Sequence, residues 1–277
     1  MEIFRHKIDL QAYLNKWFAG NTIGFVPTMG ALHAGHLSLI EQSKKKCGVT
    51  VCSIFVNPTQ FNDPSDLAKY PRPIKNDIKI LEEAGCDILY NPDAGDVYDG
   101  EPSIIHIDLG GLDKVFEGAQ RHGHFDGVVS VVKKLFNIVK PTDVFFGQKD
   151  YQQCLVVRKM IRHFNMPIKF YTCPIVREAD GLAMSSRNVR LSVEEREQAI
   201  NIYKTLKAAS LKQGLFTPAQ IEEYIYTELQ KDSLVKIEYA AIVDPTDLKP
   251  LIDWQHGAVI LVAITLPSTR LIDNVLL

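Results

Sequence analysis

Short apolar runs alternate with segments of helical periodicity over the first two-thirds of the chain, and this alternation restricts the fold more than any other feature. The predicted strands are apolar and rich in β-branched residues: 22–26, 49–56, 86–90, 144–146 and 168–175. The predicted helices repeat apolar residues at i, i+3 and i+4: 35–46, 74–84, 126–139 and 151–164. Such strand–helix–strand units build a parallel sheet with helices on both faces. We therefore expect a Rossmann-like α/β domain that binds ligands beyond the carboxyl ends of its strands.

The remaining third of the chain follows a different pattern. Ser192 and Glu195 have the spacing of a capping box at the start of a helix, and Thr217 begins a second helix. Three predicted strands then follow, at 237–243, 259–266 and 271–276. The sequence thus predicts two domains, a Rossmann-like domain over residues 1–176 and a smaller α+β domain over residues 177–277.

Composition argues against several classes of protein. Lys+Arg number 31 and Asp+Glu number 33, for a formal net charge of −2, so no positive surplus is present to coat a nucleic acid. The longest strongly apolar run, 258–266, is about half of the roughly 20 residues that span a bilayer, and the first residues do not resemble a secretory signal. Five scattered cysteines without C-x-x-C spacing fit reduced thiols. We expect a cytoplasmic protein with neither a nucleic-acid nor a membrane partner.

A histidine pair, His33 and His36, follows the first predicted strand with Gly35 between its members. A chain with this histidine content has a chance expectation of only about 0.01 for H-x-G-H. The N-terminus of a helix presents unpaired N–H groups and a positive dipole end to phosphate, and imidazoles there can donate to phosphate oxygens as charge develops. The alternative, two histidines that merely cap a helix, suits a single histidine better than this constellation.

Two further segments carry groups suited to phosphate. Residues 184–188 (MSSRN) supply hydroxyls and an arginine in the predicted interdomain loop, although alone they are more typical of an ordinary polar linker. Residues 146–150 (FGQKD) follow a predicted strand: Gly147 permits a tight turn, Lys149 offers a positive charge, and Asp150 would cap the helix or meet a ribose or metal. A capped helix with solvated charges is the alternative for this second segment.

Taken together, six ordered motifs resemble the pantothenate synthetase (pantoate–β-alanine ligase) family of the H-x-G-H nucleotidyltransferase superfamily. They are PTMGALHAGH (27–36), FVNPTQF (55–61), YPR (70–72), GHFDGV (123–128), GQKDYQQ (147–153) and MSSRN (184–188). The resemblance implies ATP-dependent condensation of (R)-pantoate with β-alanine through a pantoyl adenylate, with release of AMP and pyrophosphate. It also implies Mg²⁺, a cytoplasmic homodimer, and a smaller domain that closes over the ATP site of the first.

The resemblance also assigns roles to individual residues. The ATP-binding residues would be Met29, Gly30, His33, Gly35, His36, Gly147, Gln148, Lys149, Asp150, Val176, Met184, Ser185, Ser186 and Arg187. The catalytic residues among them would be His36, His33, Lys149 and Arg187. The substrate-binding residues would be Gln60, Gln153, Asn57, Tyr70, Arg121 and His124. The two glutamines suit pantoate because an amide can donate to a carboxylate and accept from a hydroxyl. The magnesium ligands stay unassigned, with Asp77 as a candidate.

Two other functions are compatible with the motifs. Another H-x-G-H nucleotidyltransferase would transfer a nucleotide to a phosphate substrate, but that reaction needs more cationic groups than this chain places in its motifs. A non-catalytic ATP-binding regulator would not need phosphate-binding groups in two separate segments. A tRNA synthetase is disfavoured, because Ser186 and Arg187 stand where that class carries lysines and the chain has no basic excess.

Overall fold

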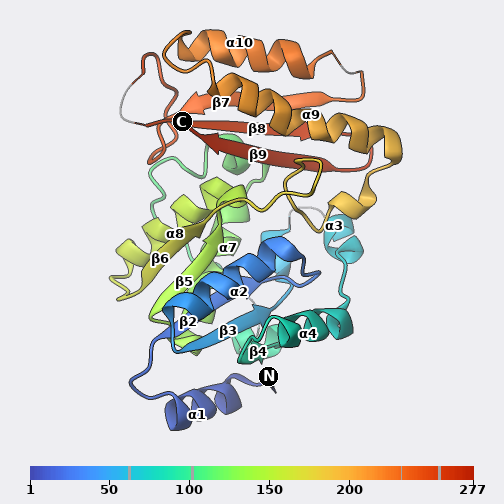
Figure 1. Cartoon of the computed structure of the whole chain (residues 1–277). Coiled ribbons are helices and arrows are strands. Elements are labelled where there is room, and N and C mark those ends of the chain that lie inside the picture. Colours follow the sequence, from blue (N-terminus) through green and yellow to red (C-terminus); the bar gives the residue numbers. More distant parts are fainter. Residues whose placement is uncertain (62–63, 101–102, 232, 255–256) are drawn as a thin grey trace. The chain divides into compact units, whose positions relative to one another are not determined.

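The computed structural model describes residues 1–61, 64–100, 103–231, 233–254 and 257–277 (Figure 1). The chain forms two compact units. Unit 1 comprises Met1–Gly147 and Gln152–Pro174, and unit 2 comprises Gln148–Tyr151 and Ile175–Leu277. The second junction lies within two residues of the predicted boundary after residue 176. The short segment 148–151, which the sequence analysis placed in the first domain, groups with unit 2 instead.

Unit 1 is built on a six-stranded sheet in the order β1-β4-β3-β2-β5-β6, and every pair of neighbouring strands is parallel. Its strands are β1 (Glu2–Phe4), β2 (Ile23–Thr28), β3 (Val49–Ile54), β4 (Ile88–Tyr90), β5 (Asp143–Gly147) and β6 (Lys169–Cys173). All residues of the central strand β3 are buried, as expected for a strand covered on both faces. The predicted fold class is confirmed.

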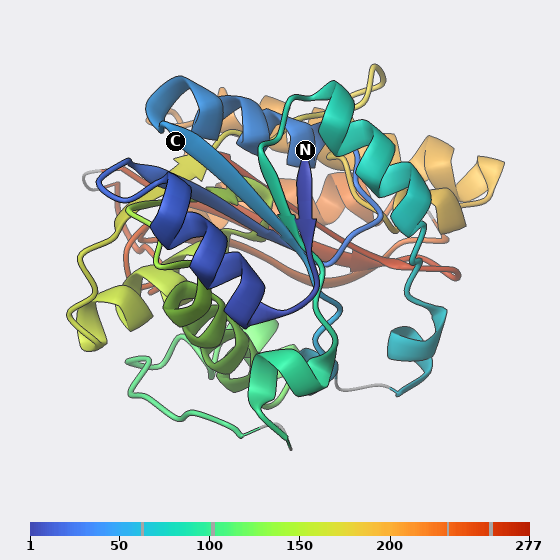
Figure 2. The same ribbon diagram turned by 90° about the horizontal axis from the view of Figure 1, so that it is seen from below.

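Helices cover both faces of this sheet, with α2 and α4 on one face and α1 and α7 on the other (Figure 2). The helices of unit 1 are α1 (Lys7–Trp17), α2 (Ala34–Lys46), α3 (Pro64–Lys69), α4 (Ile74–Glu83), α5 (Ala94–Tyr98), α6 (Phe116–Gln120), α7 (His124–Val139) and α8 (Tyr151–His163). The core under α2 and α4 includes Val26, Ile40, Leu81 and Phe145. Helix α7 has an apolar stripe and ends where Lys140 adopts a left-handed conformation before Pro141.

Unit 2 packs two helices against a three-stranded antiparallel sheet in the order β7-β8-β9. Its elements are α9 (Val193–Ser210), α10 (Pro218–Leu229), β7 (Lys236–Val243), β8 (Val259–Thr265) and β9 (Arg270–Leu276). Both predicted helix starts are confirmed: the Ser192 hydroxyl accepts the Glu195 N–H at 3.2 Å, and the Thr217 hydroxyl accepts the Gln220 N–H at 3.3 Å. Among the described residues, no helix is both long and apolar enough to cross a membrane.

Candidate active site

The loop between β2 and α2 makes a sharp, strained turn. Thr28 donates its hydroxyl hydrogen to the Ser53 carbonyl at 2.7 Å, and the same hydroxyl accepts the Gly30 N–H at 3.2 Å. Gly30 has a φ of 82° and Ala31 a φ of 51°, so both lie in the left-handed region. Glycine adopts that region freely, whereas an alanine does so at a cost of roughly 1–2 kcal/mol. The turn therefore needs compensating interactions.

Asp77 of α4 supplies them. Its side chain is 1% exposed, and its two oxygens accept the Ala31 N–H at 2.9 Å and the Leu32 N–H at 2.8 Å. A Cβ at Gly30 would lie 3.0 Å from an Asp77 oxygen, so a larger residue there would require the carboxylate to move. Asp77 thus holds the loop that leads to the histidine pair, a role that the sequence analysis missed.

His33 and His36 form a reciprocal cap at the first turn of α2. The Nδ1 of His33 accepts the Gly35 N–H at 3.2 Å, and the Nδ1 of His36 accepts the His33 N–H at 3.3 Å. The ring centroids are 4.1 Å apart. Because each Nδ1 is an acceptor, each neutral ring carries its hydrogen on Nε2. The capping alternative and the phosphate-donor hypothesis are therefore compatible, since they use opposite sides of the same rings.

Gln60 is the centre of a second cluster in unit 1. Its side chain donates to the Met29 sulfur at 2.9 Å and accepts from the Asn57 amide at 3.3 Å. Its backbone carbonyl accepts from the Nδ1 of His124 at 2.9 Å and from Arg121 at 3.3 Å, while Arg121 also donates to the Nε2 of His124 at 3.1 Å. The structure thus joins four predicted substrate-binding residues to Met29, a residue predicted to bind ATP.

The Gln60 cluster rests on the first turn of α7. Asn57 is 1% exposed; its amide oxygen accepts from the Tyr98 hydroxyl at 2.7 Å, and its amide nitrogen donates to the Gly127 carbonyl at 3.3 Å. A Cβ at Gly127 would lie 2.5 Å from the Thr59 carbonyl oxygen, closer than real contacts allow. Gly127 therefore permits the close approach of α7 that positions Gln60.

Tyr70 and Gln153 complete the predicted substrate-binding set. Tyr70 is buried, and its ring packs edge-on against Phe61, the residue after Gln60, with centroids 5.7 Å apart. Gln153 is half-buried on α8, and within the described part of the chain its side chain has no hydrogen-bond partner. The neighbouring Gln152 is buried and holds backbone groups of the 112–117 segment. Only Gln153 of these two glutamines is therefore available to a ligand.

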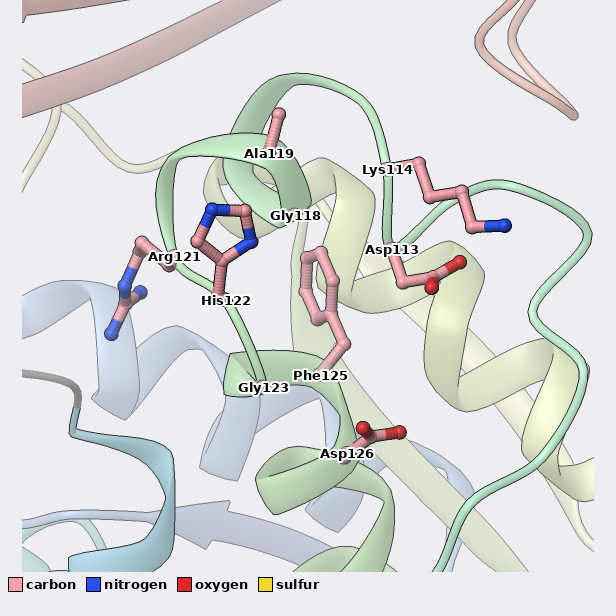
Figure 3. Close-up of a pocket in the computed structure, with 9 residues that line it drawn as sticks. All are labelled: Asp113, Lys114, Gly118, Ala119, Arg121, His122, Gly123, Phe125 and Asp126. Atoms are coloured by element: carbon pink, nitrogen blue, oxygen red, sulfur yellow. The ribbon is translucent and has the colours of Figure 1, made fainter.

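A pocket of about 300 Å³ lies beside this region (Figure 3). Its lining residues are Asp113, Lys114, Gly118, Ala119, Arg121, His122, Gly123, Phe125 and Asp126. In Figure 3 the Arg121 side chain extends away from Asp113 and Lys114, in keeping with its hydrogen bonds to the Gln60 cluster. Apart from Arg121, no lining residue belongs to the predicted site.

The remaining predicted ATP-binding residues, apart from Gly147, lie in unit 2. Gln148–Asp150 forms a 3-10 turn in which the Lys149 ammonium is 3.8 Å from the Asp150 carboxylate. The expectation of a tight turn at Gly147 is wrong, because Gly147 is the last residue of β5, pairs with Cys173 and has no positive φ. Its strand hydrogen bonds hold it extended, and the chain turns only after it.

Residues 176–184 form a short hairpin rather than an ordinary linker. Arg177 and Ala183 make an antiparallel bridge, and the Met184 N–H donates to the Val176 carbonyl at 3.0 Å. Beyond the hairpin, the Ser185 hydroxyl accepts the Arg187 N–H at 3.2 Å. The predicted ATP-binding residues of this segment therefore lie at the open end of an ordered hairpin.

No group of three or more His, Cys, Asp or Glu side chains in the described ranges is placed to hold a metal ion. Asp77, the candidate magnesium ligand, has one backbone N–H on each of its oxygens. Its contacts are those of a residue that shapes a loop.

Comparison with known proteins gives a consistent result. The family model for pantoate–β-alanine ligase matches residues 2–276. Pantothenate synthetase of Cytophaga hutchinsonii is 45% identical over 93% of this chain and 92% of the relative, and that of Bacteroides thetaiotaomicron is 42% identical over 99% and 98%.

Solved structures agree. The crystal structure of pantothenate synthetase from Thermus thermophilus has a TM-score of 0.94 at 42% identity and covers 99% of both chains. That of pantoate–β-alanine ligase from Francisella tularensis, complexed with β-γ ATP and β-alanine, has a TM-score of 0.83 at 35% identity and covers 100% of this chain and 97% of the other. The chain is a member of the pantoate–β-alanine ligase family.

Proposed function

We propose that the chain joins pantoate to β-alanine with ATP as the energy source. The pantoate carboxylate attacks the α-phosphorus of ATP, the bond to pyrophosphate breaks, and pantoyl adenylate forms. The β-alanine amine then attacks the acyl carbon, AMP leaves, and the amine loses a proton to give pantothenate. The observation that carries this proposal is the adjacent His33–His36 pair at the start of α2, in a chain matched by the family over residues 2–276.

The histidine pair serves the first step. As pyrophosphate leaves, negative charge grows on the oxygens around the α-phosphorus, and fixed N–H donors stabilise that charge better in the transition state than in the ground state. The Nε2–H groups of His33 and His36 and the N-terminus of α2 provide such donors. We assign Lys149 and Arg187 to the outer phosphates, where an ammonium and a planar guanidinium neutralise charge.

Pantoate is assigned to Gln60 and Gln153. The fixed position of Gln60 supports this role, because Asn57 holds its side chain and two cationic or polar groups, Arg121 and His124, hold its carbonyl. A side chain whose position is already fixed by hydrogen bonds loses little conformational entropy when a ligand binds. Arg121 and His124 therefore act through Gln60.

Magnesium would enter with ATP. The described side chains form no cage of their own, and Mg²⁺ is commonly bound through substrate phosphates with few protein ligands. When bound it neutralises phosphate charge. A homodimer and a cytoplasmic location stay predictions from the resemblance; sedimentation of the purified chain tests the first.

The reaction is tested by incubating the purified chain with ATP, pantoate and β-alanine and detecting products by mass spectrometry. We expect AMP and pantothenate in equal amounts, and pyrophosphate release that requires pantoate. Pyrophosphate release without pantoate but with a phosphate acceptor would identify another nucleotidyltransferase. ATP binding without any AMP would identify a regulator.

No cysteine is expected to take part. Burial raises the pKa of Cys52, and it raises that of Cys47 and Cys173 to about 11 and of Cys86 to about 12, so these four thiols stay protonated at neutral pH. Replacing all five cysteines by Ala or Ser should leave adenylation measurable, and iodoacetamide at pH 7.5 should leave the wild-type rate unchanged. Complete loss of activity in a folded cysteine-free variant would contradict the mechanism.

The same thiols predict alkaline instability. An unfolded thiol ionises near its ordinary pKa of 9.0, whereas the folded thiols hold their protons to pH 11 or above. The folded state therefore binds more protons above pH 9, and the free energy of unfolding falls as pH rises from about 9 to 12. Urea unfolding at several pH values measures the slope, which should be smaller in the cysteine-free variant.

A further inference from the structure

Strand β9 carries two buried polar residues side by side, Asp273 and Asn274, although the strand around them is apolar. Consecutive residues of a strand point to opposite faces of a sheet. Asp273 shares its face with Leu271, which packs in the core beneath α9 and α10, and Asn274 points to the other face. Neither residue belongs to the site that the sequence motifs predict.

Asn274 holds the Gln148–Lys149 turn. Its side chain is 2% exposed; its amide nitrogen donates to the Gln148 carbonyl at 2.9 Å and to the Lys149 carbonyl at 3.0 Å. Its amide oxygen accepts from the Gln148 side chain at 3.1 Å. Both donors and the acceptor of one buried amide are therefore committed to the segment that carries Lys149.

Asp273 holds the hairpin of residues 176–184. Its carboxylate binds Arg177 through two parallel hydrogen bonds of 2.6 Å and 2.9 Å. The Arg177 guanidinium also donates to the Gly181 carbonyl at 3.2 Å and lies over the Tyr203 ring at 3.5 Å. Arg177 is the residue after Val176, so the ion pair fixes the base of the hairpin. The Asp273 carboxylate further accepts the Asn274 N–H at 2.7 Å, which links the two contacts.

We propose that Asp273 and Asn274 are a positioning pair that sets the distance between the two ATP-phosphate segments of unit 2. Asn274 fixes the segment of Lys149, and Asp273 fixes the hairpin that leads to Ser185–Arg187. The position of strand β9 therefore determines where both segments lie. This inference rests on the proposed function of those segments. It assigns catalytic consequences to a strand that lies outside the predicted site.

The decisive variant is Asn274→Asp, which keeps the shape of the side chain and removes both donors. A carboxylate oxygen then faces the Gln148 and Lys149 carbonyls, and the turn must move away from β9. Because a displacement of about 1 Å at a phosphate-binding group can cost about 100-fold in rate, we expect kcat/KM for ATP to fall by about 10- to 100-fold. The KM for β-alanine should stay within about twofold, because the acyl carbon is attacked after pyrophosphate has left.

Glu238→Gln is the matched control. Glu238 of β7 forms a half-buried ion pair at 2.8 Å with Arg270, which lies on β9 like Asp273 and Asn274. The variant weakens this ion pair and changes no contact to either ATP segment. We expect a lower melting temperature with unchanged kcat/KM for ATP. Equal losses of ATP kinetics in both variants would show that β9 acts only through general stability and would overturn the proposal, as would wild-type ATP kinetics in Asn274→Asp.

If Asn274→Asp does not fold, Asn274→Ser, which keeps a neutral donor of shorter reach, replaces it under the same criteria. Calorimetric titration with ATP measures affinity without turnover. The wild-type chain assayed alongside tests the proposed function separately: absence of pantoate-dependent pyrophosphate would reject that function, whereas normal wild-type turnover with an unaffected Asn274 variant rejects only the positioning pair.

Discussion

Replacing His33 by Asn together with His36 by Gln will leave the chain folded and lower the rate of pantoyl-adenylate formation by at least about 1000-fold. Asn is a preferred N-cap residue and Gln three residues later completes a capping box, so the start of α2 keeps its hydrogen bonds. The Nε2–H donors are lost. Thermal unfolding together with pantoate-dependent pyrophosphate release separates the two roles of the histidines.

The helix α10 offers the matched control. Thr217→Ala removes the hydroxyl of a second capping box and should cost about 1 kcal/mol of unfolding free energy without changing turnover. His33→Ala should lose both stability and activity, since it removes cap and donor together. A His33→Asn/His36→Gln variant with wild-type turnover would mean that the histidines only cap the helix.

Gly127→Ala is expected to destabilise the chain by about 1–3 kcal/mol and to raise the KM for pantoate. In an ordinary helix position, replacing glycine by alanine stabilises by about 0.5–1 kcal/mol, so the sign of the change is diagnostic. Here the new Cβ would lie 2.5 Å from the Thr59 carbonyl oxygen and 3.0 Å from the Gln60 Cα. Both are backbone atoms, so relief requires that Gln60 moves. Urea unfolding and initial rates against pantoate concentration measure the two effects.

Asn137→Ala introduces the same residue on an exposed position of the same helix, α7. This control should be neutral or slightly stabilising, because alanine has the higher helix propensity. A Gly127→Ala variant that behaves like Asn137→Ala in both assays would show that α7 does not need its close approach to Gln60.

Periodicity predicted most of the long elements because the burial of one face repeats in the spacing of apolar residues. It found the central strands and helices α2, α4, α7 and α8. It missed β1, the short helices α3, α5 and α6, and the 11-residue helix α1, in which only Leu10 and Leu14 are buried. The three to six residues of β1, α3, α5 and α6 are too few to show a period, and such elements form because neighbouring structure completes their hydrogen bonds.

The motifs located the predicted site residues but not the residues that hold them. Asp77 contacts a loop more than 40 residues away, a pairing that no local pattern contains. One signal was present: Asp77 lies on the face of α4 formed by Ile74 and Leu81, where an acid needs a buried partner. Asp273 and Asn274 gave a similar signal, two polar residues in an apolar strand, but their partners lie about 100 residues away.

The hydrogen bonds at the start of α2 also restrict what kind of catalyst the histidines can be. In the structure the Nδ1 lone pair of each histidine already accepts a backbone N–H of the first turn of α2. An imidazolium carries hydrogens on both nitrogens, so in a protonated ring an Nδ1–H would face that backbone N–H. We therefore expect the two rings to act as fixed hydrogen-bond donors to an anion, and not as groups that carry protons between substrate and solvent.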